Sequence, residues 1–294
     1  MIQYKSSILM PLHSGGRNGR SAGQISRAAC FAHWLGADLR LLIAPEPDMN
    51  DLMKFEEKIL ARTPRECAFS IETDGKPLPE ATKASIERRK PEMVILNIES
   101  HFLRRSIRMA SWQRQILEES LEPVLVLSSL TKLQPFDSIV VPMKGDPMRM
   151  DAALTYSLQI GGRARIPLDI LHVSPKQLGP DSSAIGQLSD EFYHEYPRRI
   201  EEMIAEASPL SSVRERTIIR DFLQVRGDMT HEIFRSIKKH KSGLLVIEWD
   251  GKFARGRSEL IRAIILASHR PVLVVKPVLE RRSTLTLGNT TIAA

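Results

Sequence analysis

Cysteine is almost absent from this 294-residue chain, which contains only Cys30 and Cys67. Two cysteines exclude the disulfide framework of a small secreted domain and the CxxC pattern of a zinc site. We interpret both as core residues, Cys30 within a helical apolar stripe and Cys67 at the start of a strand. The histidines show no HExxH or similar paired spacing, so we expect no metal site.

Long hydrophobic runs are lacking as well. Residues 1–5 do not begin a signal-peptide apolar region, and no stretch reaches the roughly 18 apolar residues of a membrane span. The longest apolar helical segment, residues 260–267, contains Arg262. We therefore expect a cytoplasmic protein with no membrane partner.

Aromatic residues make up only 5% of the chain, so its cores must be mainly aliphatic. The apolar fraction of 42% is ordinary for globular proteins, and the length fits two domains. The net charge of +7 is spread along the chain rather than gathered in a tail. This balance suits small anionic ligands or acidic partners, and we expect no nucleic-acid partner.

Two apolar segments occur twice in the chain. Residues 7–12 (SILMPL) resemble residues 138–143 (SIVVPM), and residues 123–127 (PVLVL) resemble residues 271–275 (PVLVV). Each repeat therefore begins and ends on a strand-like segment, with about one domain length between them. We predict a first domain at residues 1–131, a similar second domain at residues 132–280 and a flexible tail at residues 281–294.

Strand and helix patterns alternate through both halves. The predicted strands cover residues 8–12, 39–44, 67–73, 93–96 and 124–127, then 139–143, 168–173, 217–225, 244–247 and 272–275. The predicted helices include residues 22–35, with Gly36 just past the end, and residues 48–62, 79–89, 106–121 and 188–207. Continuous apolar strands separated by helices indicate a parallel sheet that is covered on both faces.

Ligands of an open parallel sheet bind beyond the carboxyl ends of its strands. In the first half these ends are followed by residues 13–20 and 97–111, and in the second half by residues 144–147 and 248–258. Loops that lead into helix N-termini present free backbone N–H groups, which attract anions. We therefore expect a phosphate-bearing ligand to bind at these four segments.

Several of these segments match a known family in order and spacing. Residues 11–14 (PLHS) and 142–145 (PMKG) occupy the end of an opening strand, residues 36–42 (GADLRLL) a second strand, and residues 243–247 (GLLVI) a fourth. With the PVLVL and PVLVV segments, they resemble the universal stress proteins of the UspA-like family. That family opens with a strand ending in Pro-Val-Asp-Gly-Ser and closes with a Gly-x2-Gly-x9-Gly-Ser/Thr phosphate loop, a helix and a Pro-Val-Leu-Val-Val strand.

The resemblance covers both halves and implies an α/β fold of two adenine-nucleotide-alpha-hydrolase-like, Rossmann-like domains. Each would hold a five-stranded parallel sheet with helices on both faces, and the last strands would join the domains as a pseudo-two-fold pair. A further homodimer of such units is left open. The implied function is a stress-response regulatory or ligand-binding module that is not an enzyme, although weak ATPase activity is left open. The implied ligand is ATP or another adenine nucleotide. The resemblance also allows a protein partner, which it does not identify.

The family's nucleotide-binding residues carry over in degenerate form. The acidic residue after the first strand falls on His13 in the first half and on Lys144 in the second. The phosphate loop of the first half keeps its spacing but not its glycines, and the loop of the second half is shortened. The candidate ligand-binding residues are His13, Ser14, Gly15, Asn97, Ser100, Ala110 and Ser111, and, in the second half, Lys144, Gly145, Gly251, Gly256 and Ser258.

Both phosphate loops are basic. Arg104 and Arg105 lie in the first, and Arg255 and Arg257 lie in the second. Their guanidinium groups could replace lost backbone donors in holding a phosphate. A solvated helix start, or pairing with acidic residues across the domain interface, explains them equally well.

Two other functions remain open. One is a protein-interaction module that binds no nucleotide. The other is an ATP-using enzyme of the PP-loop type, because residues 14–19 (SGGRNG) partly resemble the Ser-Gly-Gly-x-Asp-Ser loop of that family. Asn18 and Gly19 replace its Asp and Ser, and we can nominate no catalytic residues.

Overall fold

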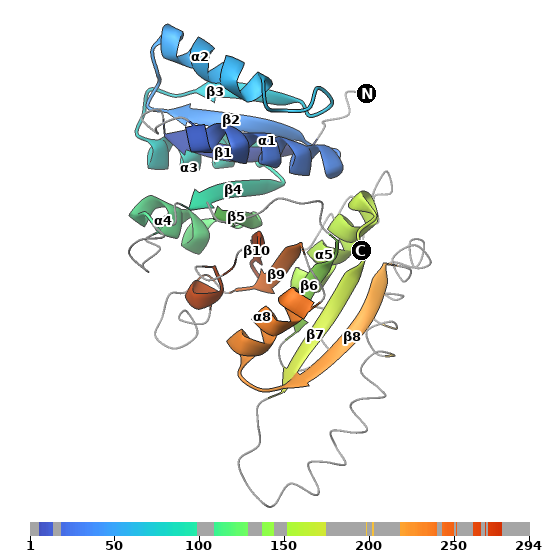
Figure 1. Cartoon of the computed structure of the whole chain (residues 1–294). Helices are drawn as coiled ribbons and strands as arrows, with labels where there is room; N and C mark the ends of the chain where they lie inside the picture. The colour runs from blue at the N-terminus through green and yellow to red at the C-terminus, as the bar shows by residue number, and fades with distance from the viewer. Residues whose placement is uncertain are drawn as a thin grey trace, which may run out of the picture.

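The computed structural model describes thirteen parts of the chain: residues 6–13, 19–98, 109–128, 137–143, 152–174, 198, 202, 218–239, 243–249, 251, 261–265, 268 and 270–277. Within them, ten strands form one sheet in the order β3-β2-β1-β4-β5-β10-β9-β6-β7-β8 (Figure 1). Counted outward from the β5–β10 pair at the centre of the sheet, the strands of the two halves follow the same order. This order is that of a doubly wound α/β fold, with the crossover point between the first and fourth strands of each half.

The first half alternates strands and helices. Its elements are β1 (Ser7–His13), α1 (Gly19–Trp34), β2 (Asp38–Ala44), α2 (Met49–Leu60), β3 (Phe69–Thr73), α3 (Leu78–Arg89), β4 (Met93–Ile98), α4 (Ser111–Glu119) and β5 (Val124–Ser128). All four strand pairings within this half are parallel.

The second half repeats the pattern. Its described elements are β6 (Ile139–Met143), α5 (Ala152–Ala164), β7 (Leu168–Ser174), β8 (Ile219–Arg226), α8 (Met229–Lys239), β9 (Leu244–Glu248) and β10 (Val272–Val275). Its strands are likewise parallel to one another.

The two halves meet where β5 pairs with β10. This pairing is antiparallel, with Leu125 opposite Leu273, and it makes the sheet continuous through the molecule. The prediction that the last strands join the halves is therefore confirmed. Pairing removes two apolar edges that would otherwise be open to aggregation.

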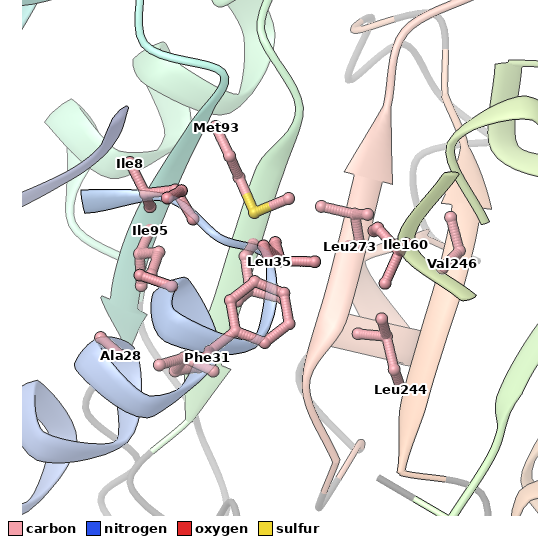
Figure 2. Close-up of a cluster of buried hydrophobic side chains, with 14 of the residues drawn as sticks. Ile8, Ala28, Phe31, Leu35, Met93, Ile95, Ile160, Leu244, Val246 and Leu273 are labelled. Carbon is pink, nitrogen blue, oxygen red and sulfur yellow. The ribbon is translucent and has the colours of Figure 1, made fainter. Parts of the chain in front are cut away.

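Helices cover both faces of the sheet, as predicted. Buried residues of α1, α2 and α5 share one hydrophobic cluster with alternate residues of the strands. Buried residues of α3, α4 and α8 pack on the other face. The first cluster spans the junction: Figure 2 shows Leu273 of β10 between Leu35 and Met93 of the first half and Ile160 of the second.

Local sequence explains how several helices begin and end. Gly36 has φ +67°, and the N–H groups of Gly36 and Ala37 donate to the carbonyls of His33 and Ala32, closing α1 in a Schellman motif. Asp48 caps α2 by accepting the Asp51 N–H at 2.8 Å.

Some predicted boundaries were wrong. Cys67 does not open a strand, because it lies in a bend stabilised by its N–H donating to the Pro64 carbonyl, and β3 begins at Phe69. Residues 109 and 110 are not helical, so the predicted helix over residues 106–121 begins only at Ser111 in the described part. Helix α1 begins earlier than predicted, at Gly19. Most of the predicted helix over residues 188–207 lies outside the described residues.

Candidate functional site

The carboxyl ends of β1 and β4 form the crossover point of the first half. The two strands are parallel neighbours, with Ile8 opposite Met93. His13 is the last residue of β1 and is exposed, and Asn97 lies near the end of β4. Three of the predicted site residues of this half, His13, Asn97 and Ser111, thus lie on strands or helices that meet at one edge of the sheet.

Helix α4 begins at this edge. Ala110 is its N-cap residue, and Ser111 is exposed at its first position. The first turn of α4 contains no acidic residue, so no carboxylate of that turn offsets the positive end of the helix dipole.

The start of α4 is fixed to β4 through Gln113. This side chain is buried; its Oε1 accepts the Ala110 N–H at 3.1 Å, and its Nε2 donates to the Asn97 carbonyl at 2.6 Å. The first contact is half of a capping box, in which the N3 side chain binds the N-cap N–H. Gln113 therefore ties the helix N-terminus to the end of the neighbouring strand.

Asn97 joins the same edge to α1. Its Nδ2 donates to Oε1 of Gln24, a buried residue of α1. Its Oδ1 is buried and has no hydrogen-bond partner among the described residues. Asn97, Gln24 and Gln113 thus form a cluster of amide side chains beside the start of α4.

Sequence reasoning missed Gln24 and Gln113. A signal for Gln113 was present, because glutamine three residues after an N-cap position is a capping-box pattern. Gln24 carried no such signal, since its contact with Asn97 depends on which strand packs beside α1.

The residue of the second half that corresponds to Asn97 is Glu248, and it makes a different contact. Glu248, at the end of β9, accepts the N–H of Ala152 through Oε2 at 2.7 Å. Ala152 is the first residue of α5, so the carboxylate lies at a helix N-terminus. The anion-attracting end of α5 is therefore already occupied by an internal negative charge.

Gly251, a predicted ligand residue of the second half, lies against the first half. It has φ +79°, and an added Cβ would overlap Lys276 Nζ and come within 2.8 Å of the Glu118 carbonyl. Lys276 Nζ donates to that carbonyl at 2.9 Å and lies 4.7 Å from the ring centroid of Trp249. Close packing between the halves thus gives a reason for glycine at this position that involves no ligand.

The remaining candidates lie outside the described residues and stay predictions. They are Ser14, Gly15, Ser100, Arg104, Arg105, Lys144, Gly145, Arg255, Gly256, Arg257 and Ser258.

A surface groove of about 460 Å³ lies elsewhere, beside the edge strand β3. Its lining includes Glu72, which accepts from Arg40 at 2.5 Å and pairs with Arg88. The charged side chains of Glu72, Arg40 and Arg88 in this groove are therefore paired with one another. Among the described residues, no group of three or more His, Cys, Asp or Glu side chains is placed to hold a metal ion.

The fold defines a class of protein: a tandem of two doubly wound α/β units joined through their last strands. Among solved structures, the chain is similar to a universal stress protein from Archaeoglobus fulgidus DSM 4304, with a TM-score of 0.61 and 18% identity over 92% of this chain and 98% of that one. It is also similar to a protein of unknown function from Pseudomonas aeruginosa PAO1, with a TM-score of 0.60 and 15% identity over 94% of both chains.

The chain thus has the tandem fold of universal stress proteins, as the sequence resemblance predicted. No family model matches the sequence, and no curated protein matches it. In the described part of the chain, no helix combines the length and apolar character needed to cross a bilayer.

Proposed function

We propose that the first half of the chain binds a nucleotide or another phosphate-bearing ligand at the carboxyl edge of β1 and β4. The observation that carries this proposal is the start of α4, where an exposed Ser111 opens a helix with no acid in its first turn. Backbone N–H groups at such a terminus bind phosphate oxygens. The chain then acts as a regulatory binding module and not as an enzyme.

The amide cluster supports this proposal because it fixes the helix start before any ligand arrives. Gln113 binds the Ala110 N–H within the helix start and the Asn97 carbonyl of β4, so α4 cannot move away from β4 without breaking the second of these hydrogen bonds. A site that is already ordered loses less entropy on binding. We place Arg104 and Arg105, which precede α4 in sequence, around the phosphate of the bound ligand.

We propose a smaller role in phosphate binding for the second half. The Glu248 carboxylate bound to the Ala152 N–H would repel an anion at the start of α5. Lys144, Gly256, Arg257 and Ser258 remain candidates for a weaker site on this side.

Isothermal titration calorimetry of the full chain tests the proposal. We expect saturable heat with ATP, AMP or cyclic AMP, and weaker heat with inorganic phosphate alone. Folded protein that gives no heat at millimolar concentrations of all four ligands would rule the proposal out.

The variant Ser111→Asp locates the site. A carboxylate at the first position of α4 would repel a phosphate bound there, and we expect affinity to fall by roughly tenfold. The same change of charge in the first turn of α2, Asn50→Asp, is the matched control, because Asn50 is also exposed near a helix start. An equal loss of affinity in both variants would place the ligand elsewhere.

A protein-interaction module is the second candidate function. Helix α2 exposes Met49, Met53 and Leu60, whose side chains are 70%, 57% and 58% exposed. At this spacing the three residues follow one side of the helix. If this function holds, Met53→Lys abolishes capture of a partner from cell extract, whereas Ser111→Asp and added nucleotide leave it unchanged.

A further inference from the structure

The two cysteines of the chain lie side by side, although no sequence pattern pairs them. Cys30 is on α1, and Cys67 is in the connection between α2 and β3. Their Sγ atoms are 3.5 Å apart. Both thiols are free.

A neighbouring contact holds this connection against α1. Ser26, one turn before Cys30, donates from Oγ to the Arg62 carbonyl at 2.7 Å. The Cys67 N–H donates to the Pro64 carbonyl at 2.9 Å, which fixes the bend that carries Cys67. The approach of the two sulfurs is therefore supported by hydrogen bonds on both sides of the contact.

The two thiols differ in accessibility. Cys30 is partly exposed, whereas the side chain of Cys67 is buried. Burial, together with the neighbouring Cys30 and the charge of Glu66, raises the pKa of the Cys67 thiol to about 12. A protonated, buried thiol reacts slowly with an oxidant from solution, so Cys30 is the first point of attack.

We propose that Cys30 and Cys67 form a redox site that closes into an intramolecular disulfide on reaction with a peroxide. The Cys30 thiolate attacks one oxygen of hydrogen peroxide and becomes a sulfenic acid, and hydroxide leaves and takes up a proton to give water. The Cys67 sulfur then loses its proton and attacks Cys30 Sγ, expelling a second water. In sum, two thiols and one peroxide give one disulfide and two waters.

Little movement is needed to form the bond. A disulfide has an S–S length of about 2.0 Å, so the sulfurs need to approach by roughly 1.5 Å. The bond would tie α1 directly to the α2–β3 connection. The disulfide would close the loop of chain between Cys30 and Cys67 and so restrict the unfolded state. We expect this restriction to raise Tm by roughly 5–10 °C.

Intact mass spectrometry of the full chain tests the proposal. After treatment with one equivalent of hydrogen peroxide, we expect a loss of about 2 Da, a cross-linked peptide containing both cysteines, and reversal by dithiothreitol. Thermal melting is measured in parallel on the oxidised and reduced protein. Cys30→Ala and Cys67→Ala are the matched controls, since alanine adds no polar group to a buried position.

Each result decides the question. The proposal holds if the wild-type chain loses about 2 Da and its Tm rises. Both single variants should instead gain oxygen or form intermolecular dimers. It fails if the wild-type chain gains oxygen at the same rate as the variants, keeps both thiols, or is cross-linked between chains. If a variant does not fold, the wild-type mass and peptide map decide alone.

Discussion

At the scale of single residues, Gly251 shows how a position outside regular structure joins the two halves. Its φ is positive, and an added Cβ would meet the Glu118 backbone carbonyl as well as Lys276 Nζ. Lys276 in turn binds the last turn of α4 through the Glu118 carbonyl. A positive side chain at a helix C-terminus also interacts favourably with the helix dipole.

We expect Gly251→Ala to lower the free energy of unfolding by about 1–3 kcal/mol, because alanine is strained at this φ and its Cβ would displace Lys276. Urea denaturation measures the effect. The control is Gly23→Ala within α1, where an added Cβ meets nothing within 4 Å. Alanine at Gly23 should stabilise the helix by about 0.5–1 kcal/mol, and a loss at both positions would contradict this explanation.

At the scale of elements, the described residues that orient the candidate site are amides. Gln113 lies on α4, Asn97 on β4 and Gln24 on α1, so three elements are linked at one edge of the sheet. The second half replaces this link with the contact between Glu248 and the start of α5. The two copies therefore share a scaffold but differ in charge at the same place.

We expect Gln113→Ala to destabilise the protein by about 1–3 kcal/mol, because it leaves the Ala110 N–H and the Asn97 carbonyl without their partner. Thermal and urea denaturation measure this loss. Gln115→Ala on the same helix is the control, since the Gln115 side chain donates to Glu119 in an exposed hydrogen bond, and we expect a change within about 0.5 kcal/mol. Equal effects would mean that the buried amide has no special role.

Local patterns predicted most elements but not the contacts among them. Gly36 was predicted just past the end of its helix, because helix ends depend on neighbours in sequence. The Cys30–Cys67 contact and the Gln24–Asn97 contact were not, since each joins residues far apart in the chain. The strand predicted at Cys67 failed because a local bend precedes β3.

At the scale of the whole molecule, the continuous core has consequences for unfolding. One hydrophobic cluster contains buried residues of both halves, including Leu35 and Leu273. The strand that carries Leu273 pairs with β5 on one side and with β9 on the other. Neither β5 nor β10 can leave the sheet without exposing the apolar surface of the other half.

We therefore expect a single calorimetric unfolding transition that Leu273→Ala shifts as a whole. Leu273 is fully buried, and truncating such a leucine costs about 2–5 kcal/mol. Leu121→Ala is the control, because Leu121 is 63% exposed and its loss should change little. Two separate transitions, of which only one moves, would show that the halves unfold independently.

The sequence by itself determined the duplication, the alternation of strands and helices, and the apolar segments that become β5 and β10. Those features follow from local apolar patterning and turn residues, which act over short distances in the chain. Only the tertiary structure decided that Gln113 binds the Asn97 carbonyl, that Gln24 binds the Asn97 side chain, that Gly251 packs between the halves, and that the two cysteines meet. These contacts depend on which elements the folded sheet brings together, and no local pattern encodes that choice.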